Sequence, residues 1–461
     1  MNHRSHTGNR KESPVSTVKM SYDNTIMHIF FSGIGGAGIG PLALIAKQAG
    51  YRVSGSDKQD SQYIQYLKKH GITDIHIGQT RDQITAVHDK RPIDWYVYSS
   101  AITKEQKHPA ELQYTTEQKI HSSKRDELLN QIIHDKKLKL IAVAGTHGKS
   151  TTTAMVVWLF NQLNVPLSYS VGAKLSFGEM GQYQKNSEYF AYECDEFDRN
   201  FLAFEPYLSV ISGVTWDHHE IFPSREDYQQ AFKEFISQSK HTICWQEDYD
   251  YLGLTSVAHI DVQNTDHPHI HDIKLAGLYN RLDAWLAIQA VHESTKTPIK
   301  KLTEIMNKFP GLSRRMEQII PNLYSDYAHT PEKIRGAMSV ALEMCEKSTP
   351  TRKLIVVYEG LTDRRQHFMI DDYKDCFDGA EHVYWVPSYL AREDPDKRVI
   401  PPTELISHLS DPTIASSMDR NEELKKVIQK HLDSGDMVVA MVGGGGGSLD
   451  DWIREEFSSL N

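Results

Sequence analysis

The stretch that decides the fold is Lys139–Phe160, KLIAVAGTHGKSTTTAMVVWLF. An aliphatic run leads into a glycine turn and then a helical run, which is typical of a strand that feeds a helix in a parallel α/β sheet. The same pattern occurs in IMHIFFSGIGGAGIGPLALIAKQAG at 26–50. A third block contains RKLIVVYEG at 352–360 and DMVVAMVGGGGGSLDDW at 436–452. The sequence therefore predicts three α/β domains.

Length and breaks in the pattern divide the chain. At about 150 residues per domain, 461 residues suit three domains. A polar helical stretch ends before Lys139, and FPGLS at 309–313 interrupts a helical run with a proline and a glycine. We expect a disordered polar tail at 1–24 and domains at 25–139, 140–312 and 313–461. The expected fold class is α/β throughout, with a Rossmann-like N-terminal domain, a P-loop ATPase-like central parallel sheet and a Rossmann-like C-terminal domain.

Composition excludes several classes of protein. Lys plus Arg number 51 and Asp plus Glu number 61, which gives a net charge of −10. Because no basic stripe could neutralise many phosphates, a nucleic-acid partner is disfavoured. The apolar runs are far shorter than the roughly 18–20 residues that span a bilayer. Four scattered cysteines without a CxxC pair argue against a disulfide framework or a zinc cluster. We expect a cytoplasmic protein with no membrane insertion.

The glycine turn of the opening stretch has the features of a phosphate loop. Its residues are Gly145, Thr146, His147, Gly148, Lys149, Ser150 and Thr151. Backbone N–H groups can turn toward anionic oxygens, Lys149 can reach the β and γ phosphates, and Ser150 or Thr151 can hold Mg²⁺. The spacing departs from GxxxxGK[ST], because Val143 stands where that motif has its first glycine. The strand before the turn and the helix after it favour a phosphate site over a plain glycine turn.

Two acidic clusters end the strand-like runs that follow. ECDEFD occupies 193–198, and DHHE occupies 217–220. Carboxyl ends of parallel strands share one edge of a sheet, so both clusters should lie where ligands bind. Carboxylates there suit Mg²⁺, which prefers oxygen ligands. A surface acidic turn is the alternative for the first cluster.

The first domain carries another glycine turn. It consists of Gly33, Gly35, Gly36, Ala37 and Gly38, and Asp57 follows about 20 residues later. The run fits GxGxxG only loosely, and an acidic residue at that distance could bind a ribose hydroxyl. The pattern predicts a nucleotide or nucleotide-sugar diphosphate at a helix N-terminus, with NAD as the less favoured ligand.

The third block carries paired arginines. Arg314 and Arg315 stand at the domain break, DYAHTP at 326–331 follows a short strand-like run, and Arg364 and Arg365 come later. Arginines near a domain boundary suit bidentate capture of phosphate or carboxylate across a cleft. A solvated basic turn is an equally good interpretation of Arg364 and Arg365.

Taken in chain order, these motifs resemble the Mur ligases, ATP-dependent amide-forming enzymes of peptidoglycan precursor synthesis. GIGGAGIGPLALIAKQAGYRVSGSD at 33–57 and YVYSSAI at 96–102 resemble the UDP-sugar domain of that family. VAGTHGKSTTT at 143–153 resembles its ATP loop. The resemblance covers nearly the whole chain after residue 24 and is strongest to the alanine-adding members.

The resemblance implies a role for each matching residue. Catalysis would use Lys149, His218 and Arg315, and Mg²⁺ would be held by Glu193, His218 and Ser150 or Thr151. ATP would be bound by the phosphate loop, Asn280, Arg315 and Asp326. The UDP-sugar would be bound by the first glycine turn, Asp57, Ser99 and Ser100. The amino acid would be bound by Tyr327, His329 and Arg365.

The reaction that the resemblance implies joins UDP-N-acetylmuramate to an amino acid, with L-alanine expected. ATP phosphorylates the muramyl carboxylate, and the amine of the amino acid attacks the resulting acyl phosphate. Mg²⁺ would be the cofactor, and closure of three domains would exclude water. We expect these substrates to be the partners, a monomer or weak homodimer, and roles in cell-wall biogenesis, cell shape and cell division.

Departures from the family pattern fall at expected substrate contacts. Tyr279 and Asp283 replace the histidine and second asparagine of GxHNxxN, and Gln79 replaces a histidine of the first domain. Thr362 stands where the alanine-adding enzymes have the first of two arginines, which leaves the added amino acid open. The alternatives are a ligase that recycles a preformed tripeptide, a non-catalytic nucleotide-binding protein and an NAD-dependent dehydrogenase.

Overall fold

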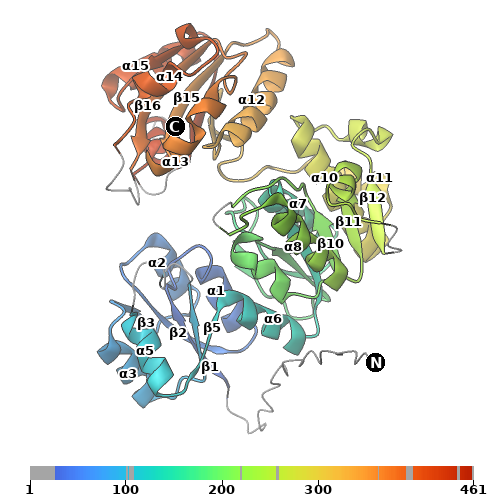
Figure 1. Cartoon of the computed structure of the whole chain (residues 1–461), viewed down its shortest axis with the longest axis vertical. Coiled ribbons are helices and arrows are strands. Elements are labelled where there is room, and N and C mark those ends of the chain that lie inside the picture. The colour runs from blue at the N-terminus through green and yellow to red at the C-terminus, as the bar shows by residue number, and fades with distance from the viewer. Residues whose placement is uncertain are drawn as a thin grey trace, which may run out of the picture.

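The computed structural model describes residues 26–99, 102, 108–218, 221–255, 259–361, 363–390, 398–443 and 447–458. Three α/β units follow one another along the long axis of the molecule, each built on its own sheet (Figure 1). The expected tail at 1–24, the proposed UDP-sugar-binding residue Ser100 and the departure at Thr362 lie outside the described residues. For Arg365 the structure describes the backbone only. In the described part of the chain, none of the helices has both the length and the apolar character needed to cross a bilayer.

The first unit has a five-stranded parallel sheet in the order β3-β2-β1-β4-β5. Its strands are β1 (His28–Ser32), β2 (Arg52–Asp57), β3 (Ile75–Ile77), β4 (Trp95–Tyr98) and β5 (His121–Lys124). Its helices are α1 (Gly40–Gln48), α2 (Gln62–Lys69), α3 (Arg81–Lys90), α5 (Ala110–Glu117) and α6 (Arg125–Asp135). The strand order reverses between β1 and β4, which is where open α/β sheets bind ligands. The glycine turn follows β1 at this point.

The central unit has a seven-stranded sheet in the order β12-β11-β10-β6-β9-β7-β8, parallel except for β8. Its strands are β6 (Lys139–Ala144), β7 (Leu167–Ser170), β8 (Gly181–Gln182), β9 (Tyr189–Glu193), β10 (Leu208–Ile211), β11 (Thr242–Trp245) and β12 (Ile260–Gln263). Its α-helices are α7 (Lys149–Gln162), α8 (Arg225–Gln238), α9 (Gln246–Tyr251), α10 (Leu278–Thr295) and α11 (Ile299–Met306), with 3₁₀ turns at Phe197–Ala203 and Pro268–Asp272. Helices α7 and α10 share one hydrophobic core, because both are apolar on most faces.

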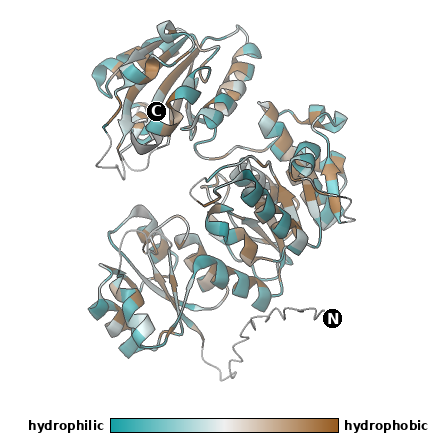
Figure 2. Ribbon diagram, in the orientation of Figure 1, coloured by the Kyte–Doolittle hydropathy of each residue, from teal (hydrophilic) through white to brown (hydrophobic). Residues whose placement is uncertain are grey.

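The third unit has a six-stranded sheet in the order β13-β14-β18-β15-β16-β17, in which only the β13–β14 pair is antiparallel among the pairs described. Its strands are β13 (Glu317–Ile320), β14 (Leu323–Asp326), β15 (Leu354–Leu361), β16 (His382–Tyr389), β17 (Ala415–Ser417) and β18 (Met437–Val442). Its α-helices are α12 (Pro331–Glu346), α13 (Asp363–Met369), α14 (Pro402–Ile406), α15 (Glu422–Asp433) and α16 (Leu449–Ser458), with 3₁₀ turns at Ile370–Tyr373 and Pro412–Ile414. Figure 2 shows hydrophobic residues along the strands and hydrophilic residues on the outer helices.

The predicted fold class of three α/β domains is confirmed by these sheets. The first sheet ends at Lys124, the second spans Lys139 to Gln263, and the third begins at Glu317. The boundary proposed after 312 falls between the second and third sheets, whereas the boundary proposed after 139 falls just inside β6, whose first residue is Lys139. Both boundaries stay predictions. Between the second and third units, Arg314 and Met316 have left-handed backbone angles, with φ of 57° and 47°. Non-glycine residues adopt this conformation at a cost, so the backbone on both sides of Arg315 is strained.

Candidate active site

The phosphate loop joins β6 to α7 in the middle of the central sheet. Gly148 has φ of 76° and directly precedes the first helical residue, Lys149. A Cβ on Gly148 would lie 2.4 Å from Asp283 Oδ1, and a Cβ on Gly145 would lie 2.6 Å from Ser212 Oγ. The Thr146 hydroxyl donates to the Thr215 carbonyl at 2.7 Å. Glycine is therefore required at two loop positions because neighbouring elements press against the backbone.

Lys149 is the buried cation of the loop. Its ammonium donates to the Gly145 carbonyl at 2.6 Å and to Glu196 Oε2 at 2.7 Å. Burial by itself would lower the pKa of Lys149, but the adjacent Glu196 carboxylate outweighs burial and raises it. Burial also raises the pKa of Glu196, against the effect of Lys149. The loop therefore holds a permanent positive charge with one buried acidic partner.

The acids of the 193–198 segment face two directions. Glu193 accepts a hydrogen bond from Ser150 Oγ at 2.7 Å, and Glu196 accepts from Lys149. Both therefore face the phosphate loop. Asp195 and Asp198 instead face the first unit, where they form ion pairs with Arg125 and Lys124. Sequence reasoning proposed Glu193 as a metal ligand and gave Glu196 no role of its own. The only indication of a role for Glu196 was its place in the acidic run.

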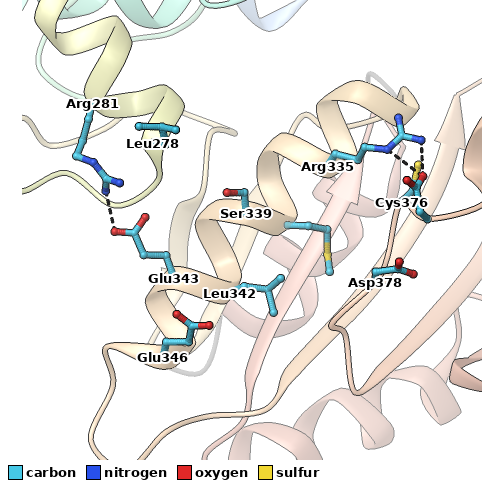
Figure 3. Close-up of a pocket in the computed structure, with 11 residues that line it drawn as sticks. Leu278, Arg281, Arg335, Ser339, Leu342, Glu343, Glu346, Cys376 and Asp378 are labelled. Atoms are coloured by element: carbon cyan, nitrogen blue, oxygen red, sulfur yellow. Dashed lines mark hydrogen bonds and ion pairs between the residues drawn. The ribbon is translucent and has the colours of Figure 1, made fainter. Parts of the chain in front are cut away.

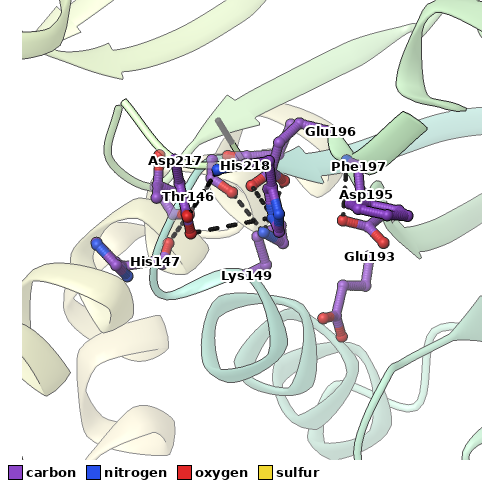
Figure 4. Close-up of polar contacts among 12 residues, drawn as sticks. Thr146, His147, Lys149, Glu193, Asp195, Glu196, Phe197, Asp217 and His218 are labelled. Atoms are coloured by element: carbon purple, nitrogen blue, oxygen red, sulfur yellow. Dashed lines mark hydrogen bonds and ion pairs between the residues drawn. The ribbon is translucent and has the colours of Figure 1, made fainter. Parts of the chain in front are cut away.

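The second acidic cluster lies on the other side of the loop, because β6 separates β9 from β10. His218 Nε2 is 3.7 Å from Glu196 Oε1 and 3.9 Å from Asp217 Oδ2. Figure 4 shows Lys149 and His218 converging on Glu196. Burial would raise the pKa of Asp217, but His218, His147 and Lys333 together more than offset burial, and the pKa is lowered. The sheet therefore brings Lys149, Glu196 and His218 together; His219 and Glu220 lie outside the described residues.

The oxygen donors beside the loop fit a magnesium ion. Of the two hydroxyl residues that the sequence offered, Ser150 is the one hydrogen-bonded to Glu193. The second oxygen of Glu193 accepts from the Gly172 N–H at 2.6 Å, which fixes the carboxylate. No group of three His, Cys, Asp or Glu side chains in the described residues forms a metal cage. This arrangement suits Mg²⁺, which commonly uses one or two carboxylates together with substrate phosphates and water.

The start of α10 lies beside the loop. Asn280 donates to the Ala276 carbonyl at 2.8 Å, and Tyr279 is 64% exposed. Asp283 is buried, and burial raises its pKa to about 8. A carboxyl group next to Gly148 is therefore neutral over much of the physiological range.

Helix α12 of the third unit contacts this region twice. Glu332 Oε2 is 3.1 Å from His147 Nε2 of the phosphate loop. Three turns later, Glu343 accepts from the Gly277 N–H at 2.8 Å and from Arg281 Nη1 at 2.7 Å. A cleft of about 550 Å³ lies between α10 and α12 beside the Arg281–Glu343 pair (Figure 3). Sequence reasoning singled out neither Glu332 nor Glu343, because no motif marks a contact between units.

The predicted residues of the third unit with described side chains lie together. Asp326 is buried, accepts a hydrogen bond from the Met316 N–H at 2.8 Å, and has a pKa that burial raises to about 6. The Arg315 guanidinium lies 5.4 Å from the centre of the Tyr327 ring. His329 is buried, and its ring centre is 4.7 Å from that of Tyr327. The strand end at Asp326 therefore gathers the residues proposed for ATP and for the amino acid.

In the first unit, the predicted residues form the turn itself. The Gly35 N–H donates to Asp57 Oδ2 at 2.8 Å, so Asp57 holds the turn in place. Gln79, which stands where the resembled family has histidine, donates to Ser32 Oγ at 3.0 Å. Ser99 follows β4, at the point where the strand order reverses. The turn and Ser99 thus flank the position that is expected to bind a ligand.

Comparisons with known proteins identify the same family in all three units of the chain. The catalytic-domain model of the Mur ligase family matches residues 28–137, its middle-domain model matches 143–279, and the model named Mur ligase, glutamate ligase domain, matches 314–444. A UDP-N-acetylmuramate–L-alanine ligase of Alkaliphilus metalliredigens is 26% identical over 92% of this chain and 96% of its own. The ligase of the same name from Clostridium acetobutylicum is 28% identical over 90% and 95%.

Solved structures show the same fold. The UDP-N-acetylmuramate-alanine ligase of Thermotoga maritima superposes with a TM-score of 0.71 at 22% identity, covering 94% of this chain and 99% of its own. A murein peptide ligase of Psychrobacter arcticus gives 0.60 at 20% identity, covering 94% and 98%. At these identities the likeness supports the three-unit fold.

Proposed function

The chain belongs to the Mur ligase family, and from this premise we propose that it joins UDP-N-acetylmuramate to an amino acid, with L-alanine expected. It is an ATP-dependent ligase that forms a carbon–nitrogen bond. The observation that carries the proposal is the constellation around the loop, in which Lys149, Ser150, Glu193 and His218 meet at one edge of the central sheet.

Phosphoryl transfer from ATP needs positive charge more than covalent chemistry. Lys149 supplies a fixed ammonium at the N-terminus of α7, where the helix dipole also favours phosphate. Glu196 keeps this ammonium in place, and His218 contacts the same carboxylate. Ser150 and Glu193 would hold Mg²⁺, which when bound would neutralise charge on the phosphates.

The third unit would complete the site. Arg315 lies on a strained linker, and the contact between Glu332 and His147 brings α12 to the phosphate loop. This placement supports a role for Arg315 at the ATP phosphates. Exclusion of water by the assembled units would protect the acyl phosphate until the amine attacks.

The amino acid would bind at the carboxyl end of β14. Tyr327 and His329 pack against each other there, which supports a small pocket. We propose Arg365 as the partner of the amino-acid carboxylate. The four cysteines are free, and we place the reaction in the cytoplasm, catalysed by a monomer or weak homodimer.

One assay tests the proposed function. ADP release is measured with ATP, Mg²⁺ and UDP-N-acetylmuramate against each of the twenty amino acids and against the preformed tripeptide. We expect L-alanine to give the fastest release. Release with the tripeptide alone would identify a recycling ligase. No release with any acceptor, despite measurable ATP binding, would identify a binding protein.

A further inference from the structure

Arg125 stands where the glycine turn of the first unit meets the acidic segment of the central unit. It is the first residue of α6, directly after β5, at the same edge of the sheet as the turn. A Cβ on Gly38 would lie 2.6 Å from Arg125 Nη1. The guanidinium therefore rests against the backbone of the turn.

The carboxylates that face Arg125 are distant partners. Its Nε lies 3.5 Å from Asp126 Oδ1, and its Nη2 lies 3.7 Å from Asp195 Oδ2. Charge-assisted N–H···O bonds are typically about 2.7–2.9 Å long. The adjacent Lys124, in contrast, donates a direct hydrogen bond to Asp198. Among the residues that the structure describes, the guanidinium is thus held at the turn by charge and has no close bidentate carboxylate partner.

The glycine turn needs a cation from outside its own sequence. Residues 33–46 contain no lysine or arginine. The N–H groups of Gly33 and Ile34 donate to the Ser56 carbonyl, and that of Gly35 donates to Asp57. These donors are used within the protein, which reduces what the turn alone can offer to an anion. A diphosphate in a partly dry site must be neutralised by other groups.

We propose that Arg125 binds the diphosphate of the UDP-sugar, exchanging the distant Asp195 carboxylate for phosphate oxygens. The proposal rests on the proposed function and names a binding residue for its nucleotide-sugar substrate. The planar guanidinium suits two phosphate oxygens, and its position against Gly38 places it at the helix N-terminus of the turn. Loading the substrate would then weaken one ionic contact between the first and central units, while the Lys124–Asp198 pair remains.

Calorimetric titration of the full-length protein tests this assignment with three ligands: UDP, UDP-N-acetylglucosamine and UDP-N-acetylmuramate. Arg125→Gln should weaken binding of all three about tenfold or more, because all share the diphosphate. Arg125→Lys should recover part of the loss. Lys124→Gln is the matched control, since it removes a neighbouring interface cation that pairs with Asp198 and should change affinity less than about twofold.

A second variant, Asp195→Asn, should strengthen ligand binding instead of weakening it. Asp195→Asn removes the carboxylate that competes for Arg125, so the affinity for UDP should rise by about two- to fivefold. A loss in Arg125→Gln restricted to UDP-N-acetylmuramate would identify the muramyl carboxylate as the partner and overturn the assignment. Unchanged UDP affinity in both Arg125 variants, with circular dichroism like that of the wild type, would also overturn it. A wild-type protein that binds none of the three ligands would contradict the proposed function itself.

Discussion

Lys149 Nζ and Glu196 Oε2 lie 2.7 Å apart, and the Glu196 side chain has no exposed surface. The pair joins the first residue of α7 to the acidic segment after β9. Breaking a buried pair normally leaves an uncompensated charge. Here Glu196 can take up a proton, since burial already raises its pKa. The charge of Lys149 is therefore separable from the stability of the fold.

Lys149→Ala should lower kcat for ADP release by about 10²- to 10⁴-fold, because the phosphate-loop cation is lost where charge develops. The fold should persist, as measured by circular dichroism. Lys139→Ala is the control: it removes a lysine from the opposite end of β6, where the ammonium pairs with Glu188 at the surface. Near-normal turnover in Lys149→Ala would contradict the assignment of the loop.

Asp283→Asn should change how stability depends on pH. Burial raises the pKa of Asp283 from its ordinary value of 3.8 to about 8. Between these values the folded chain holds a proton that the unfolded chain has released, so the free energy of unfolding falls as pH rises. The variant should lose that contribution, which is at most about 1.4 kcal/mol per pH unit.

Urea unfolding at pH 6 and pH 8.5 measures the Asp283 effect. Asp326, whose pKa is about 6, titrates in the wild type and the variant alike. The change in unfolding free energy between the two pH values is compared for the wild type and Asp283→Asn. The difference between these two pH dependences therefore isolates Asp283. Equal pH dependences would show that its carboxyl group is not held neutral by burial.

Arg365→Ala should raise the KM for the amino acid about tenfold or more and leave the KM for ATP little changed, since it removes a binding contact remote from the phosphates. Arg365→Lys should recover only part, because an ammonium cannot form a bidentate pair. Arg335→Ala is the control, since Arg335 pairs with Asp375 at 2.5 Å on the surface of the third unit. If Arg335→Ala raised the KM for the amino acid and Arg365→Ala did not, Arg335 would be identified as the partner of the amino-acid carboxylate.

Glu343→Gln should loosen the docking of the third unit. The carboxylate accepts hydrogen bonds from Arg281 and the Gly277 N–H, so the amide keeps the shape but loses the charge. Small-angle X-ray scattering should give a larger radius of gyration, and trypsin should cut the 309–316 linker about threefold faster or more. Glu346→Gln on the same helix, an exposed residue, is the control. If both variants gave the same radius of gyration and the same cleavage rate, contacts other than those of Glu343 would hold the third unit in place.

Much of the fold could be predicted because the strands are buried on both faces. HIFFS forms β1, LIAVA forms most of β6 and MVVAMV forms β18, as expected for parallel strands covered by helices. The local order of strand, glycine turn and helix also located the phosphate loop. Such signals lie within about twenty residues and need no knowledge of the packing.

The remaining features depend on contacts between distant segments. Glu196 acquires its role from Lys149, 47 residues earlier, and Asp283 acquires its raised pKa from burial beside Gly148. Glu343 and Arg281 come from different units. No local spacing encodes these pairings, because they arise only when the sheets and helices are assembled.

The division of the 193–198 segment between two neighbours also restricts how its length can vary. Glu193 and Glu196 serve the loop, whereas Asp195 and Asp198 serve the first unit, so the spacing decides which acid meets which cation. A one-residue insertion after Glu193 would turn the Glu196 carboxylate away from Lys149 and toward the first unit. The protein should therefore tolerate some substitutions in the 193–198 segment far better than any insertion or deletion there.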